Sequence, residues 1–134
     1  MSMKVLMVDS DWRFSGQAAN FLESRAHHVV SEPRPRQAVA HAQKWQPDLA
    51  LVAAETANLD VIKALYEMSP RPAVLVVGRM DRYDKAWQAW QTGGDELLMK
   101  PVFKAEELHD AIVTAMENRA TGRRGNNQGL SATA

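Results

Sequence analysis

Acidic and basic side chains lie directly after short apolar runs of this sequence. Asp9 and Asp11 follow the first run, with Ser10 between them, and Lys100 ends the last run. Carboxylates beside a lysine are either remnants of a functional pocket that binds charged groups or partners in a salt bridge. We favour a salt bridge between Asp9 and Lys100. The third run ends in Ala53, whose methyl group is neither a nucleophile nor a metal ligand.

Five apolar runs of this kind alternate with longer segments of helical period. The runs predict strands at residues 4–8, 28–31, 49–53, 73–77 and 96–99. Their spacing of roughly 20 to 25 residues is typical of repeated strand–helix units. The first, third and fourth runs are nearly continuous in apolar residues, which indicates central parallel strands. The second and fifth are shorter and more polar, so we expect them near the edges of the sheet.

The segments between the runs are amphipathic and predict helices. These helices are expected at residues 12–25, 35–45, 59–68, 81–91 and around 108–115, with Asn58 as the cap of the third. The alternation predicts an α/β fold: a doubly wound, five-stranded parallel sheet in the order 2-1-3-4-5 between two layers of helices, as in flavodoxin-like proteins. In such a sheet the functional site lies beyond the carboxyl ends of the central strands. This brings Asp9, Ala53, Val77 and Lys100 to one edge.

Length and composition favour one domain. The 134 residues are 46% hydrophobic, enough for one compact core. Residues 1–117 are expected to form this domain and residues 118–134 a disordered tail, because the tail has a single large apolar residue. The N-terminal apolar stretch is too short for a signal peptide or a membrane span, so a cytoplasmic protein without a membrane partner is expected.

Several function classes have no support in the composition. No cysteine occurs, which excludes disulfides and thiolate metal sites. The four histidines lack the spacing of a metal site, so no metal ligand set is predicted. The tail carries three arginines and no acid, which leaves the folded part mildly acidic. We therefore expect no nucleic-acid-binding surface on the folded domain.

Three features together resemble the receiver domain of two-component response regulators. They are Val8-Asp9-Ser10-Asp11, the third apolar run introduced by Pro47-Asp48, and Gly93-Gly94-Asp95-Glu96-Leu97-Leu98-Met99-Lys100-Pro101. The resemblance covers residues 3 to about 117. In that family, paired acids after the first strand hold Mg²⁺, and an aspartate ending the third strand takes a phosphoryl group from a histidine kinase. A lysine then bonds the phosphoryl oxygens, and a hydroxyl residue and an aromatic residue relay the switch.

The sequence keeps only part of this pattern. Asp9 and Lys100 match the first acid and the lysine, and the resemblance implies a cis peptide before Pro101. Four positions depart from the family: Ser10 at the second acid, Ala53 at the phosphoacceptor, Val77 at the hydroxyl residue and Leu97 at the aromatic residue. Glu55 is expected to point away from the pocket, so it offers no replacement carboxylate. The resemblance therefore implies a pseudo-receiver without Mg²⁺ or another cofactor.

The function expected from this resemblance is a phosphorylation-independent interaction module of two-component or phosphorelay signalling, and not an enzyme. Its partner, another signalling protein or a second copy in a homodimer, is expected to bind a face that includes Tyr83, Trp87, Leu97 and Glu106. Trp87 is either core or an exposed anchor, and Trp90 is expected in the core. Trp12 is expected to cover the degenerate pocket. Two alternatives are a switch gated by a small ligand in the vacated pocket and an enzyme of flavodoxin-like shape.

Overall fold

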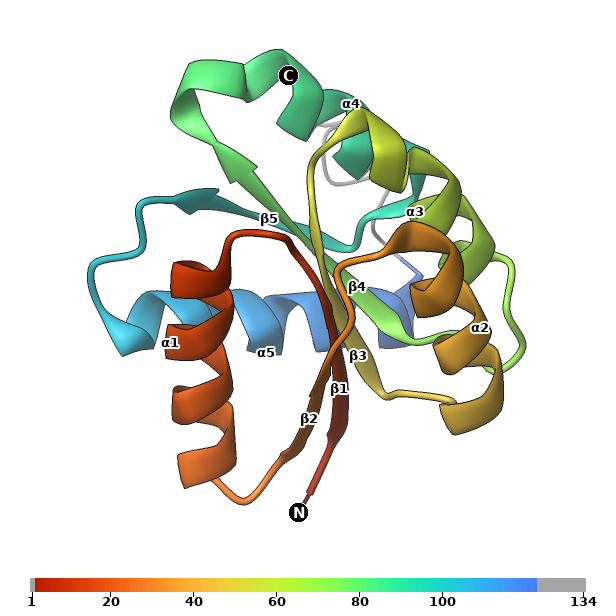
Figure 1. Cartoon of the computed structure of the whole chain (residues 1–134), viewed down its shortest axis with the longest axis horizontal. Coiled ribbons are helices and arrows are strands. Elements are labelled where there is room, and N and C mark those ends of the chain that lie inside the picture. The colour runs from red at the N-terminus through yellow and green to blue at the C-terminus, as the bar shows by residue number, and fades with distance from the viewer. Residues whose placement is uncertain (1, 123–134) are drawn as a thin grey trace.

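The fold is a five-stranded parallel sheet between two layers of helices (Figure 1). The computed structural model describes residues 2–122. The sheet has the predicted order, β2-β1-β3-β4-β5. Its strands are β1 (Lys4–Val8), β2 (His28–Ser31), β3 (Leu49–Ala53), β4 (Ala73–Arg79) and β5 (Glu96–Lys100). The helices are α1 (Trp12–Ser24), α2 (Pro35–Trp45), α3 (Leu59–Tyr66), α4 (Tyr83–Gly93) and α5 (Ala105–Thr121), with short 3-10 turns η1 (Thr56–Asn58) and η2 (Met80–Arg82) before α3 and α4.

Each face of the sheet has its own apolar core. Helices α1 and α5 cover one face and α2, α3 and α4 cover the other (Figure 1). Every residue of β3 is buried, whereas β2 and β5 are only partly buried, as expected for edge strands. Because successive side chains of a strand point to opposite faces, a central strand must be apolar throughout to serve both cores. None of the helices within residues 2–122 has the length and apolar character needed to cross a bilayer.

Helix α5 ends four residues later than the predicted domain boundary at residue 117. Two side chains of this last turn hold it to the sheet: Asn118 Nδ2 donates to the carbonyl of Asp95 at 2.9 Å, and Arg119 Nε donates to the carbonyl of Arg71 at 3.0 Å. Polar hydrogen bonds therefore extend the folded unit beyond the last apolar residues of the helix. The rest of the predicted tail, residues 123–134, lies outside the described residues.

Asn58 occupies the expected position before α3 but has a different role. Its side chain is buried and forms no cap hydrogen bond with the helix. Instead, Asn58 Nδ2 donates to the carbonyl of Ala53 at 3.0 Å. The prediction of a capping side chain was wrong because the 3-10 turn η1 directs the amide back to the end of β3.

Candidate functional site

An ion-pair cluster lies at the carboxyl edge of the sheet, where the sequence predicted it. Lys100 Nζ donates to Asp9 Oδ2 and to Asp11 Oδ2, each at 2.9 Å. The Asp9 side chain is only 3% exposed and that of Lys100 is 13% exposed, whereas Asp11 is more accessible at 43%. The predicted Asp9–Lys100 salt bridge is therefore confirmed, and Asp11 joins it. One ammonium group faces two carboxylates.

Local structure fixes each member of this cluster. Asp9 directly follows β1, and its Oδ1 accepts the backbone N–H of Asp11 at 2.9 Å. Asp11 Oδ1 accepts the N–H of Phe14, which makes Asp11 the N-cap of α1. Lys100 ends β5, and its peptide bond to Pro101 is cis, as the resemblance implied. The Lys100 ammonium also lies 4.8 Å from the centre of the Phe14 ring.

The charge of Lys100 has an electrostatic effect on Asp11. The hydrogen bond from Lys100 lowers the pKa of Asp11 below its ordinary value, and the bond from Phe14 N–H acts in the same direction. Asp11 therefore stays ionised at any pH at which the protein is normally handled. The ammonium group is held by two carboxylates.

Ala53 occupies the end of β3, where the resembling family has its phosphoacceptor. It is buried and pairs with Val77 on β4, which is buried as well. The backbone N–H of Ala54 donates to the carbonyl of Val77 at 2.8 Å. The two positions that would carry a nucleophile and a hydroxyl group thus present only methyl groups at the floor of the pocket.

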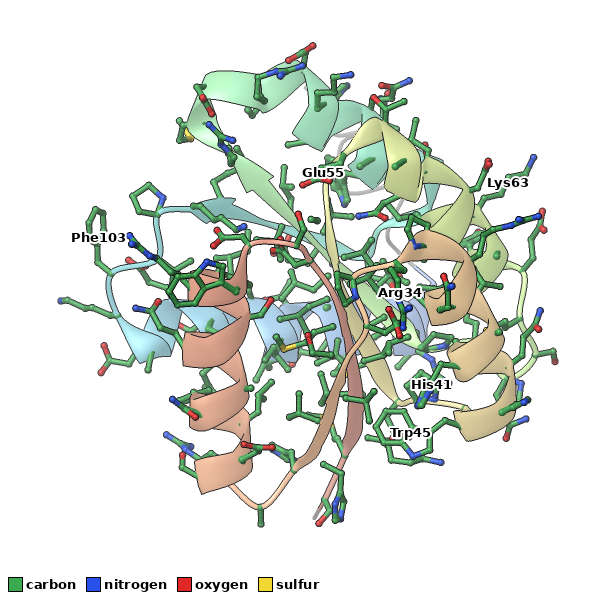
Figure 2. All side chains as sticks on the ribbon, viewed as in Figure 1. Arg34, His41, Trp45, Glu55, Lys63 and Phe103 are labelled. Carbon is green, nitrogen blue, oxygen red and sulfur yellow. The ribbon has the colours of Figure 1, made fainter. Side chains whose placement is uncertain are left out.

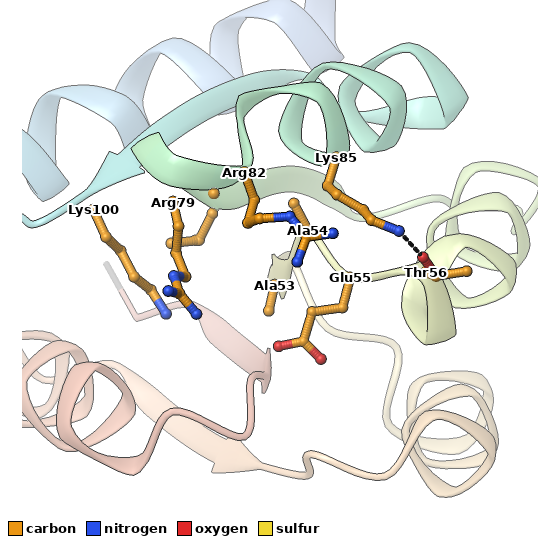
Figure 3. Close-up of a pocket in the computed structure, with 10 residues that line it drawn as sticks. Ala53, Ala54, Glu55, Thr56, Arg79, Arg82, Lys85 and Lys100 are labelled. Carbon is orange, nitrogen blue, oxygen red and sulfur yellow. Dashed lines mark hydrogen bonds between the residues drawn. The ribbon is translucent and has the colours of Figure 1, made fainter.

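Glu55 points into the pocket, contrary to our expectation. The backbone turns sharply at Ala54, where the N–H of Glu55 donates to the carbonyl of Ala53 at 2.9 Å, and Glu55 itself is extended (φ −125°, ψ 151°). Figure 3 shows its carboxylate beside Ala53, and Figure 2 places the residue at the loop after β3. The sequence interpretation failed here because the tight turn after the last ladder residue, which no sequence period predicts, sets the direction of the Glu55 side chain.

The donors present do not fit the Mg²⁺ site of the resembling family. Mg²⁺ requires oxygen ligands in near-octahedral geometry. Both oxygens of Asp9 are engaged, one by Lys100 and one by a backbone N–H, and Asp11 is shared between Lys100 and the start of α1. The third carboxylate position is Ala53, and Ser10 at the second is exposed. Within residues 2–122 no group of three or more His, Asp or Glu side chains is arranged to hold a metal ion.

A cavity of about 310 Å³ opens above Ala53 (Figure 3). Small residues, including Ala54 just after β3 and Gly78 on β4, form part of its wall. Cationic side chains line the rest: Arg79, Arg82, Lys85 and Lys100. The sequence placed the segment 77–80, which contains Arg79, at this edge of the sheet, but sequence reasoning missed Arg82 and Lys85. The signal that could have found these two is their position soon after the fourth apolar run, at the same sheet edge as Lys100.

Trp12 does not cover the pocket, so this expectation was wrong. Its side chain is 74% exposed at the first turn of α1 and stacks with the guanidinium of Arg13, 5.3 Å from the ring centre. Helix α1 starts immediately after Asp11 and carries Trp12 to its outer side. Phe103, in the loop after β5, is also exposed and projects away from the domain (Figure 2).

The residues expected to bind a partner lie on α4, β5 and α5. Tyr83 is 51% exposed and stacks on the half-buried Trp87, with ring centres 6.4 Å apart. Trp90, expected in the core, is also half-buried and packs edge-on against Trp87 at 5.1 Å. The inner side of α4 consists instead of small residues, Ala86, Ala89 and Gly93. Leu97 is half-buried on the edge strand β5, and Glu106 is exposed in the first turn of α5.

Solved structures share this fold. The chain superposes on NtrX from Brucella abortus with a TM-score of 0.79 and 20% identity, over 95% of this chain and 29% of the NtrX chain. A response regulator receiver domain protein from Clostridium thermocellum gives a TM-score of 0.74 at 20% identity and covers 88% of this chain and 97% of its own. The signal receiver domain of a response regulator from Bermanella marisrubri gives 0.71 at 26% identity, over 82% and 94%.

Comparison of the sequence alone, without the structure, finds no relative. No protein-family model matches it, and no curated protein matches it either. The chain spans less than a third of NtrX, so the likeness to that protein concerns one part of it. The chain has the fold of response regulator receiver domains, and its strand order is the one expected from the sequence.

Proposed function

We propose that this chain is a receiver-like signalling protein of the two-component or phosphorelay type that acts without phosphorylation, as a protein–protein interaction module. The observation that carries the proposal is the methyl group of Ala53, which lies where a receiver domain has its acceptor carboxylate. An alanine cannot form the acyl phosphate on which the ordinary switch depends. The receiver fold supports the signalling class.

The rest of the pocket supports the same proposal. Lys100, the residue that would bond phosphoryl oxygens, is already held by Asp9 and Asp11 at 2.9 Å. Val77 and Leu97 stand at the positions whose hydroxyl and aromatic groups would report phosphorylation. A pocket without acceptor, metal ligand set and relay has no means of ordinary phosphotransfer. We therefore propose that the protein is not an enzyme and that it needs no metal cofactor.

The proposed binding face consists of the exposed sides of α4, β5 and α5, and we name it the α4–β5–α5 face. Tyr83 and Trp87 form a stacked aromatic pair on it, and aromatic side chains are enriched among residues that dominate binding energy. Strand β5 is an edge of the sheet, with one side open to pairing. A protein partner or a second copy of the chain can use both features. The absence of nucleic-acid and membrane partners, and the cytoplasmic location, stay predictions from the sequence.

A comparison of two tryptophan variants tests this face. The tagged protein is isolated from its native cells with its partner, and the recovery of that partner is measured again with Trp87→Ala. Because truncating a central aromatic residue costs about 2 kcal/mol or more, partner affinity should fall by at least roughly thirtyfold. Trp12→Ala is the matched control, since it removes an exposed tryptophan outside the face. Size-exclusion chromatography with light scattering shows whether the partner is a second copy.

Circular dichroism must show that both variants keep the fold. Unchanged recovery with Trp87→Ala, or an equal loss with Trp12→Ala, contradicts the assignment of the α4–β5–α5 face.

A further inference from the structure

The cavity above Ala53 has an unbalanced set of charges. Its lining includes four cationic side chains and a single acidic one, Glu55 (Figure 3). Two of the cations are compensated nearby. Lys100 binds Asp9 and Asp11, and Arg79 pairs with Asp81, with Nη2–Oδ2 at 2.7 Å.

The other two cations, Arg82 and Lys85, have no carboxylate partner within residues 2–122. Lys85 Nζ donates to a neutral group, Thr56 Oγ1, at 2.6 Å. Figure 3 shows the Arg82 side chain reaching over Ala54 and the Lys85 side chain reaching across to Thr56. The two positive groups thus border one side of the cavity, and small residues leave space beside them.

We propose that this cavity binds, without a covalent bond, the phosphate group of a small phosphate monoester between Arg82 and Lys85. A guanidinium group presents parallel N–H donors that match two phosphate oxygens, and an ammonium group supplies a point charge for the third. Two uncompensated cations balance the charge of a monoester dianion. The missing side chain at position 53 leaves the space that a group of this size needs.

Glu55 defines the rest of the ligand. Its carboxylate accepts hydrogen bonds from hydroxyl groups and repels a second anionic group. The ligand is therefore a monoester that carries hydroxyl groups, of the sugar-phosphate class, and not a diphosphate or triphosphate. This site goes beyond the proposed interaction module and does not depend on the α4–β5–α5 face. The proposed phosphate site depends only on the alanine at position 53 and on Arg82 and Lys85, which lie outside the ion-pair cluster.

Isothermal titration calorimetry with the full chain tests the site. The probes are inorganic phosphate, glucose 6-phosphate, glucose and ADP. We expect saturable binding of glucose 6-phosphate, weaker binding of phosphate and ADP, and none of glucose. Removing one charged donor should weaken glucose 6-phosphate binding by at least about tenfold in Arg82→Ala and in Lys85→Ala.

Matched controls separate this site from general charge effects. Arg36→Ala and Lys63→Ala remove the same groups from exposed positions outside the cavity and should bind like the unmodified protein (Figure 2 shows Lys63 on α3). Glu55→Gln should bind inorganic phosphate more tightly, because it removes the opposing charge.

Equal affinities in Arg82→Ala, Lys85→Ala and the controls would overturn the proposal. So would a protein that binds neither inorganic phosphate nor glucose 6-phosphate. Tighter binding of ADP than of glucose 6-phosphate would overturn the ligand class. These results leave the Trp87→Ala comparison unaffected, so failure of this site and failure of the interaction module can be told apart.

Discussion

The substitution Ala53→Asp tests how far the pocket has changed from that of a phosphorylated receiver. It places a carboxylate at the end of β3, beside a cluster in which one ammonium group already faces two carboxylates. The new charge is repelled by Asp9, Asp11 and Glu55, and it is attracted by Lys100 and by the cavity cations Arg82 and Lys85. The net effect without a divalent cation should be destabilising.

The size of the effect follows from Coulomb's law. At a separation of about 5 Å and an effective dielectric constant of about 20, each pair of charges contributes about 3 kcal/mol. Within the ion-pair cluster, two repulsions and one attraction leave a loss of about 3 kcal/mol in the free energy of unfolding, while Glu55 opposes the attraction of Arg82 and Lys85 from the other side of the cavity. In a domain of this size that loss lowers the Tm by roughly 10 °C. Most of a typical stability of about 5–15 kcal/mol remains, so the variant should still fold.

Mg²⁺ should reverse part of this loss. With three carboxylates, the variant gains a ligand set for the cation, and at ten times its Kd the cation returns about 1.4 kcal/mol. The assay is thermal unfolding with and without Mg²⁺. Ala53→Asn is the matched control, because it has nearly the same shape without the charge; it should lose less stability and show no response to Mg²⁺. Equal behaviour of the two variants, or an equal Mg²⁺ response of the unmodified protein, would refute the electrostatic account of this pocket.

Three further predictions concern other parts of the fold. Asp95→Ala should lower the free energy of unfolding in urea by about 2–4 kcal/mol, because the half-buried Arg71, now bonded through Nη1 and Nη2 at 2.8 Å, and the buried N–H of Val74 both lose their carboxylate acceptor; a loss below 1 kcal/mol would contradict this. Burial raises the pKa of Glu96, so the folded state holds the proton of this carboxyl more tightly than the unfolded state. The free energy of unfolding therefore falls as the pH rises from the ordinary pKa of a glutamate through the raised pKa of Glu96. Glu96→Gln should therefore stabilise the protein at pH 7, with a gain that shrinks below about pH 4, whereas a gain independent of pH would exclude this cause. Gly78→Ala should cost about 1–3 kcal/mol, since a Cβ there would lie 2.5 Å from Ala86 Cβ, while Gly16→Ala, with nothing within 4 Å, should not destabilise α1.

The sequence predicted the backbone of this fold well because the sheet depends on simple apolar patterns. The runs at β1, β2 and β3 have the predicted bounds, and the strand order follows from the alternation of strands and helices. The bounds of α4 and α5 were less accurate. Hydrogen bonds decide these ends: the 3-10 turn η2 precedes α4, and Asn118 and Arg119 extend α5.

The site was predicted in part. The edge of the sheet and the Asp9–Lys100 pair follow from strand direction alone. The positions of Glu55 and Trp12 do not, because they depend on how the chain turns just after a strand: a tight turn precedes Glu55, and helix α1 begins at Trp12. The cationic lining of the cavity depends on long side chains after β4, whose direction no sequence period defines.

A pseudo-receiver and a phosphorylated receiver differ in whether the pocket can accept a phosphoryl group. The measurement is intact-mass and peptide mass spectrometry, at neutral pH, after incubation with acetyl phosphate and Mg²⁺. The double variant Ser10→Asp with Ala53→Asp serves as the comparison, because it restores the second acid and the acceptor. We predict an acid-labile phosphoryl adduct at position 53 of the double variant and none on the unmodified protein. A phosphoryl adduct on the unmodified protein, mapped to Asp9, Asp11 or Glu55, would contradict the central claim.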